Sequence, residues 1–187
     1  VLTHRIAYLI GAQGVSPFQI LAITFTNKAA TEMAERVGQL VGEHLGRQMW
    51  VTTFHKACVR VLRRELSRLG YSSSFTIYDQ QDSQRLIKQV MADRNLNDKR
   101  LTPRAVQHTI SRAKDQLVDF ETFRAQATHW PQTVVADVYE GYQQRLLRAN
   151  ALDFDDLIVK TVEVFQLFPE VLASWQQRFR YLLVDEA

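Results

Sequence analysis

Two adjacent carboxylates, Asp185 and Glu186, follow the apolar run Tyr181–Val184. A carboxylate at the end of a buried strand can hold Mg²⁺, directly or through water. A second carboxylate beside it can orient or deprotonate the water that attacks a γ-phosphate. The pair is therefore the catalytic candidate of this chain, although an ordinary strand end that happens to be acidic would show the same pattern.

A polar turn follows the apolar run Ile20–Thr24, and it supplies an aromatic ring, a hydroxyl, an amide and an ammonium group from Phe25, Thr26, Asn27 and Lys28. Because a helix is predicted to begin here, its N–H groups and partial positive charge would suit a phosphate. The ring could stack on a base, which is how single-stranded nucleic acid is usually held. The alternative is a helix cap with a phenylalanine in the core.

A second turn of this kind, Thr53, Phe54 and His55, follows the short strand predicted at Trp50–Thr52. His55 could donate to a phosphate, or it could simply cap the next helix and pack. Both aromatic turns and the acidic pair each follow a predicted strand of one α/β sheet. The three groups are therefore expected at one edge of that sheet, where open α/β sheets bind their ligands.

The elements that position these groups alternate between strand and helix in the first part of the chain. The continuous apolar run Ile20–Thr24 predicts a buried parallel strand, and the apolar spacing after it predicts a helix over residues 28–41. From about residue 79 to residue 150 the pattern is almost entirely helical. Asp153–Asp156 then predicts an N-cap with an acidic first turn, and strand patterning returns. The sequence predicts an α/β fold with a helical insertion.

Composition sets broad limits on the class of protein. The chain has 187 residues, of which 46% are hydrophobic, so it can bury a hydrophobic core. Its formal net charge of +3 is compatible with a nucleic-acid partner. The single cysteine, Cys58, excludes an internal disulfide framework, and no apolar run is long enough to span a bilayer. A basic cluster in the predicted insertion is interpreted as a solvated helix face, with a contact to a duplex backbone as the alternative. Its members are Lys99, Arg100, Arg104, Arg112 and Lys114.

Four segments, in their order and spacing, resemble the UvrD/PcrA/Rep group of superfamily 1 DNA helicases. The run Thr24–Ala30 is highly specific to that group, and the resemblance covers essentially the whole chain. The four segments are Ile20–Met33, Thr52–His55, Ala151–Leu157 and Tyr181–Ala187, and Phe75–Asp79 and Ile110–Lys114 fit as well.

The resemblance implies a partial RecA-like P-loop parallel sheet with an inserted all-helical subdomain. Residues 1–75 would be the first part of motor domain 1A, residues 76–150 the helical insertion subdomain 1B, and residues 151–187 the return to domain 1A, which stops at the Asp-Glu motif. The phosphate-binding Gly-rich loop (Walker A) would precede Val1, so no cofactor-binding residue of that loop is expected within the chain. The chain is therefore interpreted as an internal piece that does not hydrolyse ATP by itself.

The resemblance also implies site residues and cofactors. ATP and Mg²⁺ are the expected cofactors, with Asp185 serving Mg²⁺ and Glu186 activating water as the catalytic residue. Lys56 stands where the group commonly has Ser. The residues expected to contact single-stranded DNA are Phe25, Thr26, Asn27, Lys28, Thr53, Phe54 and His55.

The implied function of the intact protein is that of an ATP-dependent DNA helicase. It would move on single-stranded DNA, typically 3′ to 5′, and unwind duplex DNA in repair or replication restart. The protein is expected in the cytoplasm of a bacterial cell, in association with the nucleoid. No membrane partner is expected. Two alternatives stay open: a helicase–nuclease subunit of the same superfamily, and a non-catalytic module that binds single-stranded DNA.

Overall fold

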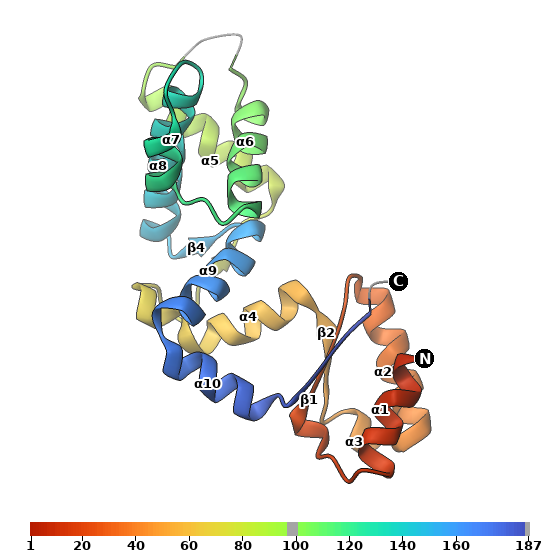
Figure 1. Ribbon diagram of the computed structural model, residues 1–187. Coiled ribbons are helices and arrows are strands. Elements are labelled where there is room, and N and C mark those ends of the chain that lie inside the picture. The colour runs from red at the N-terminus through yellow and green to blue at the C-terminus, as the bar shows by residue number, and fades with distance from the viewer. Residues whose placement is uncertain (97–100, 186–187) are drawn as a thin grey trace. The chain divides into compact units, whose positions relative to one another are not determined.

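The computed structural model describes residues 1–96 and 101–185 (Figure 1). The chain divides into two compact units, described separately below. The first unit contains Val1–Val61 and the described chain from Val164 on, and the second contains Leu62–Glu163. Helices α4 (Phe54–Glu65) and α9 (Phe154–Leu167) each run from one unit into the other. No helix among the described residues is both long and apolar enough to cross a membrane.

The first unit is built on a parallel sheet of three strands in the order β2-β1-β5. These strands are β1 (Ile20–Thr24), β2 (Trp50–Thr53) and β5 (Tyr181–Val184). Ala22, in the middle of β1, pairs with Val51 on one side and Leu183 on the other. The sequence predicted that the first and last strands share one parallel sheet, and this pairing confirms it.

Helices α1 (Leu2–Gly11) and α2 (Asn27–Val41) lie beside the sheet, as Figure 1 shows. The core between them follows from helical spacing on α2, where Met33 and Val37 are buried one turn apart. Gly42 ends α2 with a φ of 94°, a conformation that costs glycine little. The buried members of this core are Ile6, Leu9, Ile20, Ala22, Met33, Val37 and Met49.

Shorter elements complete the first unit. Helix α3 (Glu43–Gly46) follows α2 directly, and α10 (Pro169–Arg178) leads into β5. A 3-10 turn at Pro17–Gln19 enters β1. A second 3-10 turn, Leu66–Leu69, follows α4 directly, is capped by Gly70 and belongs to the second unit.

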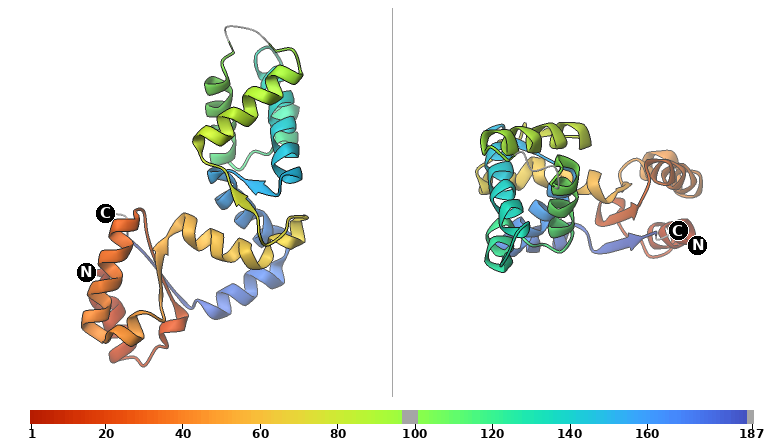
Figure 2. Two further views of the ribbon diagram at one scale, coloured as in Figure 1. Left: turned by 180° about the vertical axis from the view of Figure 1, so that it is seen from behind. Right: turned by 90° about the horizontal axis from the view of Figure 1, so that it is seen from above.

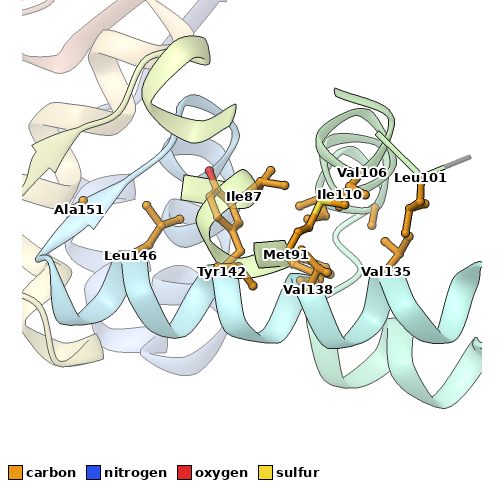
Figure 3. Close-up of a cluster of buried hydrophobic side chains, with 13 residues drawn as sticks. Ile87, Met91, Leu101, Val106, Ile110, Val135, Val138, Tyr142, Leu146 and Ala151 are labelled. Atoms are coloured by element: carbon orange, nitrogen blue, oxygen red, sulfur yellow. The ribbon is translucent and has the colours of Figure 1, made fainter. Parts of the chain in front are cut away.

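Four helices form the body of the second unit: α5 (Gln80–Asp93), α6 (Pro103–Asp115), α7 (Phe120–Gln126) and α8 (Gln132–Arg148). They pack side by side (Figure 2), which agrees with the helical patterning over residues 79–150. Figure 3 shows their shared core. Its labelled members are Ile87, Met91, Leu101, Val106, Ile110, Val135, Val138, Tyr142, Leu146 and Ala151.

A two-stranded parallel sheet closes the base of this helical body. Strand β3 (Thr76–Ile77) pairs with β4 (Ala151–Leu152), so the start and the end of the helical segment lie side by side. The side chain of Asn150 adds two hydrogen bonds to Ser72, one to its backbone N–H and one to its hydroxyl. Strands of two residues carry no readable periodicity, so this pairing could not be predicted from the sequence.

The second unit extends beyond the segment 76–150 that was predicted as the insertion. Arg63, near the end of α4, donates to the carbonyls of Ser73 at 2.6 Å and Phe75 at 2.8 Å. These side-chain bonds tie residues before position 76 to the helical body. The division into motor domain and insertion at residues 75 and 150 stays a prediction.

Candidate functional site

The carboxyl ends of the three parallel strands lie at one edge of the sheet. Strands β1 and β2 run in register to their last residues, Thr24 and Thr53, and β5 pairs with β1 up to Ile23 and Val184. The backbone N–H of Asp185 donates to the carbonyl of Ile23 at 2.8 Å and continues the pairing beyond the strand. The two aromatic turns and this carboxylate therefore share the edge, as the sequence predicted.

The two aromatic turns meet through their rings. The centroids of the Phe25 and Phe54 rings are 5.4 Å apart, and the ring planes are tilted by 50°. Phe54 is half-buried at the start of α4, whereas Phe25 is 64% exposed. A phenylalanine so exposed is no core residue, so the part of the alternative that placed Phe25 in the core was wrong. Phe54 supports the Phe25 ring, whose exposed surface can stack on a base.

The residues after Phe25 build the N-terminus of α2. The Thr26 hydroxyl accepts from the backbone N–H of Ala29 at 3.1 Å, so Thr26 is the N-cap. Asn27 and Lys28 occupy the first turn with exposed side chains. The Lys28 ammonium lies 3.9 Å from Glu32 and is 88% exposed, so water screens this pair and it contributes little. The ammonium group can therefore reorient toward a phosphate at little cost.

Thr53 and His55 are less accessible than the Phe25 turn. Thr53 is only 7% exposed, and its hydroxyl accepts from the backbone N–H of Lys56 at 3.4 Å. This hydroxyl therefore serves the first turn of α4. His55 is half-buried on the same turn. Seven residues were predicted to contact DNA. The four exposed ones are those of the first turn, Phe25–Lys28, whereas the three residues Thr53–His55 are buried or half-buried.

A cavity of about 430 Å³ opens beside Asp185. The first turn of α1 and one side of α2 line it, and α2 contributes one acidic side chain, Glu32, and one basic side chain, Arg36. No group of three or more histidine, cysteine or acidic side chains within residues 1–96 and 101–185 could hold a metal ion. Mg²⁺ in nucleotide sites needs only one or two carboxylates, because phosphates and waters complete its shell. Asp185 meets that requirement. Glu186, the predicted catalytic residue, lies outside the described residues.

A second cavity, of about 460 Å³, lies within the second unit and was not foreseen from the sequence. Phe154, the first residue of α9, lines it and is 55% exposed. Arg104 and His108, one turn apart on α6, bring exposed basic groups to its lining. In the sequence, this cavity is indicated only by Phe154, an apolar residue inside the acidic turn Asp153–Asp156. That pattern does not predict that the Phe154 ring is exposed.

One member of the predicted basic cluster is not on a solvated face. Lys114 is 1% exposed and forms ion pairs with Asp153 and Asp156, so its interpretation as a surface cation was wrong. The helix carries it on the same side as the buried Ile110, which is one turn away. Arg104 and Arg112 are exposed as expected, and Lys99 and Arg100 lie outside the described residues.

Comparison with known proteins extends over the whole chain. Residues 1–187 match the UvrD/REP helicase N-terminal domain family. The chain is 48% identical over 186 residues to the ATP-dependent DNA helicase PcrA of Bacillus subtilis, with 100% of this chain and 25% of that protein covered. It is 50% identical over 190 residues to the ATP-dependent DNA helicase UvrD1 of Mycobacterium leprae, with 100% and 24% covered.

The PcrA helicase of Staphylococcus aureus is similar to the same degree, at 48% identity over 186 residues. The chain thus spans about a quarter of the length of these relatives. The match to the family model extends over every residue, including both aromatic turns and the terminal carboxylates. This chain therefore belongs to the UvrD/REP helicase N-terminal domain family.

Proposed function

We propose that the protein to which this chain belongs is an ATP-dependent DNA helicase that moves on single-stranded DNA and unwinds duplexes. The observation that carries the proposal is the shared sheet edge, which has the exposed Phe25 turn on one strand and Asp185 on the next. A base-stacking surface and a phosphate-facing carboxylate on adjacent strands would couple DNA contacts to the nucleotide. The relatives named as ATP-dependent DNA helicases support the same function.

The nucleotide side of the proposal rests on the cavity beside Asp185. Asp185 would hold Mg²⁺, which when bound neutralises charge on the phosphates. Arg36, which lines the same cavity, would add positive charge near them. Glu186 would accept the proton of the attacking water, a role that its position after Asp185 supports.

The DNA side has two parts. Phe25 would stack on a base, and Thr26, Asn27 and Lys28 would hold the adjacent phosphate at the start of α2. The cavity of the second unit would bind another nucleotide of single-stranded DNA. There Phe154 would offer a ring and Arg104 a phosphate contact. Movement from 3′ to 5′, a role in repair or replication restart, and a place at the nucleoid are further parts of the proposal.

The test is made on the full-length protein with ATP and Mg²⁺. Partial duplexes with either a 3′ or a 5′ single-stranded tail are mixed with it, and strand separation and ATP hydrolysis are followed together. Hydrolysis stimulated by single-stranded DNA, with unwinding only from the 3′ tail, is expected. DNA binding without any hydrolysis would overturn the proposal and identify a binding module instead.

A further inference from the structure

The interior of the second unit holds a buried lysine with three polar partners. The Lys114 ammonium, on α6, lies 2.6 Å from Asp153 Oδ2 and 2.8 Å from Asp156 Oδ1. Its third contact is Gln143 Oε1 on α8, at 3.5 Å. An ammonium group has three N–H donors, so these partners use all of them. The relative exposures of the Lys114 and Asp156 side chains are both 0%, and that of Asp153 is 9%.

The two carboxylates also build the start of α9. Asp153 Oδ1 accepts from the backbone N–H of Asp156 at 2.8 Å, and Asp156 Oδ2 accepts from that of Asp153 at 3.4 Å. This is a reciprocal cap of the helix N-terminus. From α8, the Tyr142 hydroxyl donates to Asp153 Oδ2 at 2.8 Å, and Gln143 Nε2 donates to Asp156 Oδ1 at 3.2 Å. The first turn of α9 is thus bonded to both α6 and α8.

Lys114 and Asp153 support each other's charge, whereas burial and the Asp153 carboxylate raise the pKa of Asp156 above its ordinary value against the effect of Lys114. Burial alone would lower the pKa of Lys114, but the carboxylates of Asp156 and Asp153 raise it above its ordinary value. Burial would raise the pKa of Asp153, but Lys114 lowers it below its ordinary value. Lys114 and Asp153 therefore keep their charges near neutral pH.

Phe154 and Asp155 stand between the two anchored carboxylates, and both line the cavity of the second unit. We propose that Lys114 is a positioning residue for this cavity: it fixes the first turn of α9 so that the Phe154 ring is held in place to stack on a base. First turns of helices fray, and ordering a side chain upon binding costs free energy that prior anchoring avoids. This inference rests on the proposed binding of DNA in that cavity.

A double-mutant cycle in the full-length protein tests the inference. The background variant combines Lys114→Met with Asp156→Asn. The pair of changes removes one positive and one negative charge, so the net charge of the cluster is unchanged. Asp153 still accepts hydrogen bonds from the Tyr142 hydroxyl and from the backbone N–H of residue 156. Affinity for single-stranded DNA is measured with and without Phe154→Ala in both backgrounds. Phe25→Ala, in the first unit, is the comparator. Arg112→Met, an exposed cation on the same helix, is the matched control.

In the wild type, Phe154→Ala is expected to weaken DNA binding by about tenfold, in the range for one stacked base. In the double variant it should weaken binding by less than about twofold, whereas Phe25→Ala should have its full effect in both backgrounds. An equal effect of Phe154→Ala in both backgrounds would overturn the positioning role while leaving DNA binding by the cavity intact. No effect of Phe154→Ala in the wild type would overturn both.

Amide hydrogen exchange gives a readout that does not depend on DNA. In the double variant, exchange at Asp155–Leu157 should quicken while exchange in the centre of α8 stays as in the wild type. Unchanged exchange at those residues would contradict the inference. If the double variant does not fold, Tyr142→Phe replaces it, because this change removes one bond to Asp153 and keeps the ring. It should reduce the effect of Phe154→Ala and speed the same exchange to a smaller degree.

Discussion

At the scale of single residues, Phe25 and Lys28 would contribute to DNA binding through different forces. Phe25→Ala in the full-length protein should weaken single-strand binding by about 1–3 kcal/mol at every salt concentration, because a stacking surface is lost. Lys28→Ala should instead flatten the salt dependence, because it removes a cation that neutralises one phosphate. Titrations at several salt concentrations separate the two effects. Lys88→Ala, an exposed lysine on α5, serves as the control, and unchanged affinity of Phe25→Ala would leave Phe25 without a role.

Glu186→Gln tests the catalytic proposal at the same scale. The amide keeps the size of the side chain but cannot accept a proton from water, so ATP and DNA binding should persist while most turnover is lost. The measurement is DNA-stimulated ATP hydrolysis beside nucleotide binding. Glu35→Gln, on the exposed side of α2, should leave turnover unchanged. Turnover near the wild-type level for Glu186→Gln would remove this carboxylate from the mechanism.

At the scale of elements, the ion pairs of Lys114 with Asp153 and Asp156, at the start of α9, should contribute to the stability of the second unit. Lys114→Met alone leaves the carboxylates of Asp153 and Asp156 buried together without their cation, so it should destabilise the unit by about 3–5 kcal/mol. Adding Asp156→Asn removes the repulsion and should recover a large part of that loss. Urea unfolding of the full-length variants measures both changes. Equal stability of the single and double variants would show that the repulsion is unimportant.

At the scale of the whole molecule, alkaline pH should weaken the fold. Burial raises the pKa values of Tyr71, Tyr139 and Tyr142, and the Asp156 and Asp153 carboxylates raise that of Lys114 against the effect of burial. The folded state therefore holds these protons more tightly than the unfolded chain, in which they are lost near about pH 10. Stability should be complete below that pH and should fall as the pH rises above it.

The measurement is urea unfolding at increasing pH, with tyrosinate absorbance recorded in parallel. Among the six tyrosines of the chain, the three named above should ionise only as the second unit unfolds. Tyr142→Phe removes one of these groups, so its stability should fall less steeply with pH. A wild-type stability that stays constant between about pH 9 and pH 11 would contradict the expectation.

Local patterns were enough to predict much of the first unit. The strand Ile20–Thr24 and the helix after it follow from apolar spacing, a capping threonine and a terminal glycine, all of which act within a few residues. The parallel order of the strands follows from the βα rhythm, since consecutive parallel strands need a helical crossover. The shared edge of the two aromatic turns and Asp185 could therefore be predicted without a structure.

Contacts between distant residues were decided only by the tertiary structure. Lys114 and Asp153 are 39 positions apart, so although helical spacing from Ile110 places Lys114 on the inner side of α6, nothing near it in the sequence identifies the carboxylate that allows its charge to be buried. Likewise, the exposure of Phe25 and Phe154 depends on which side chains from other elements cover each ring. The sequence alone determined the α/β elements, the helical character of residues 79–150 and the family, because these depend on local order and spacing. The tertiary structure decided which charge is buried and which ring is exposed, because burial depends on the partners that folding brings together.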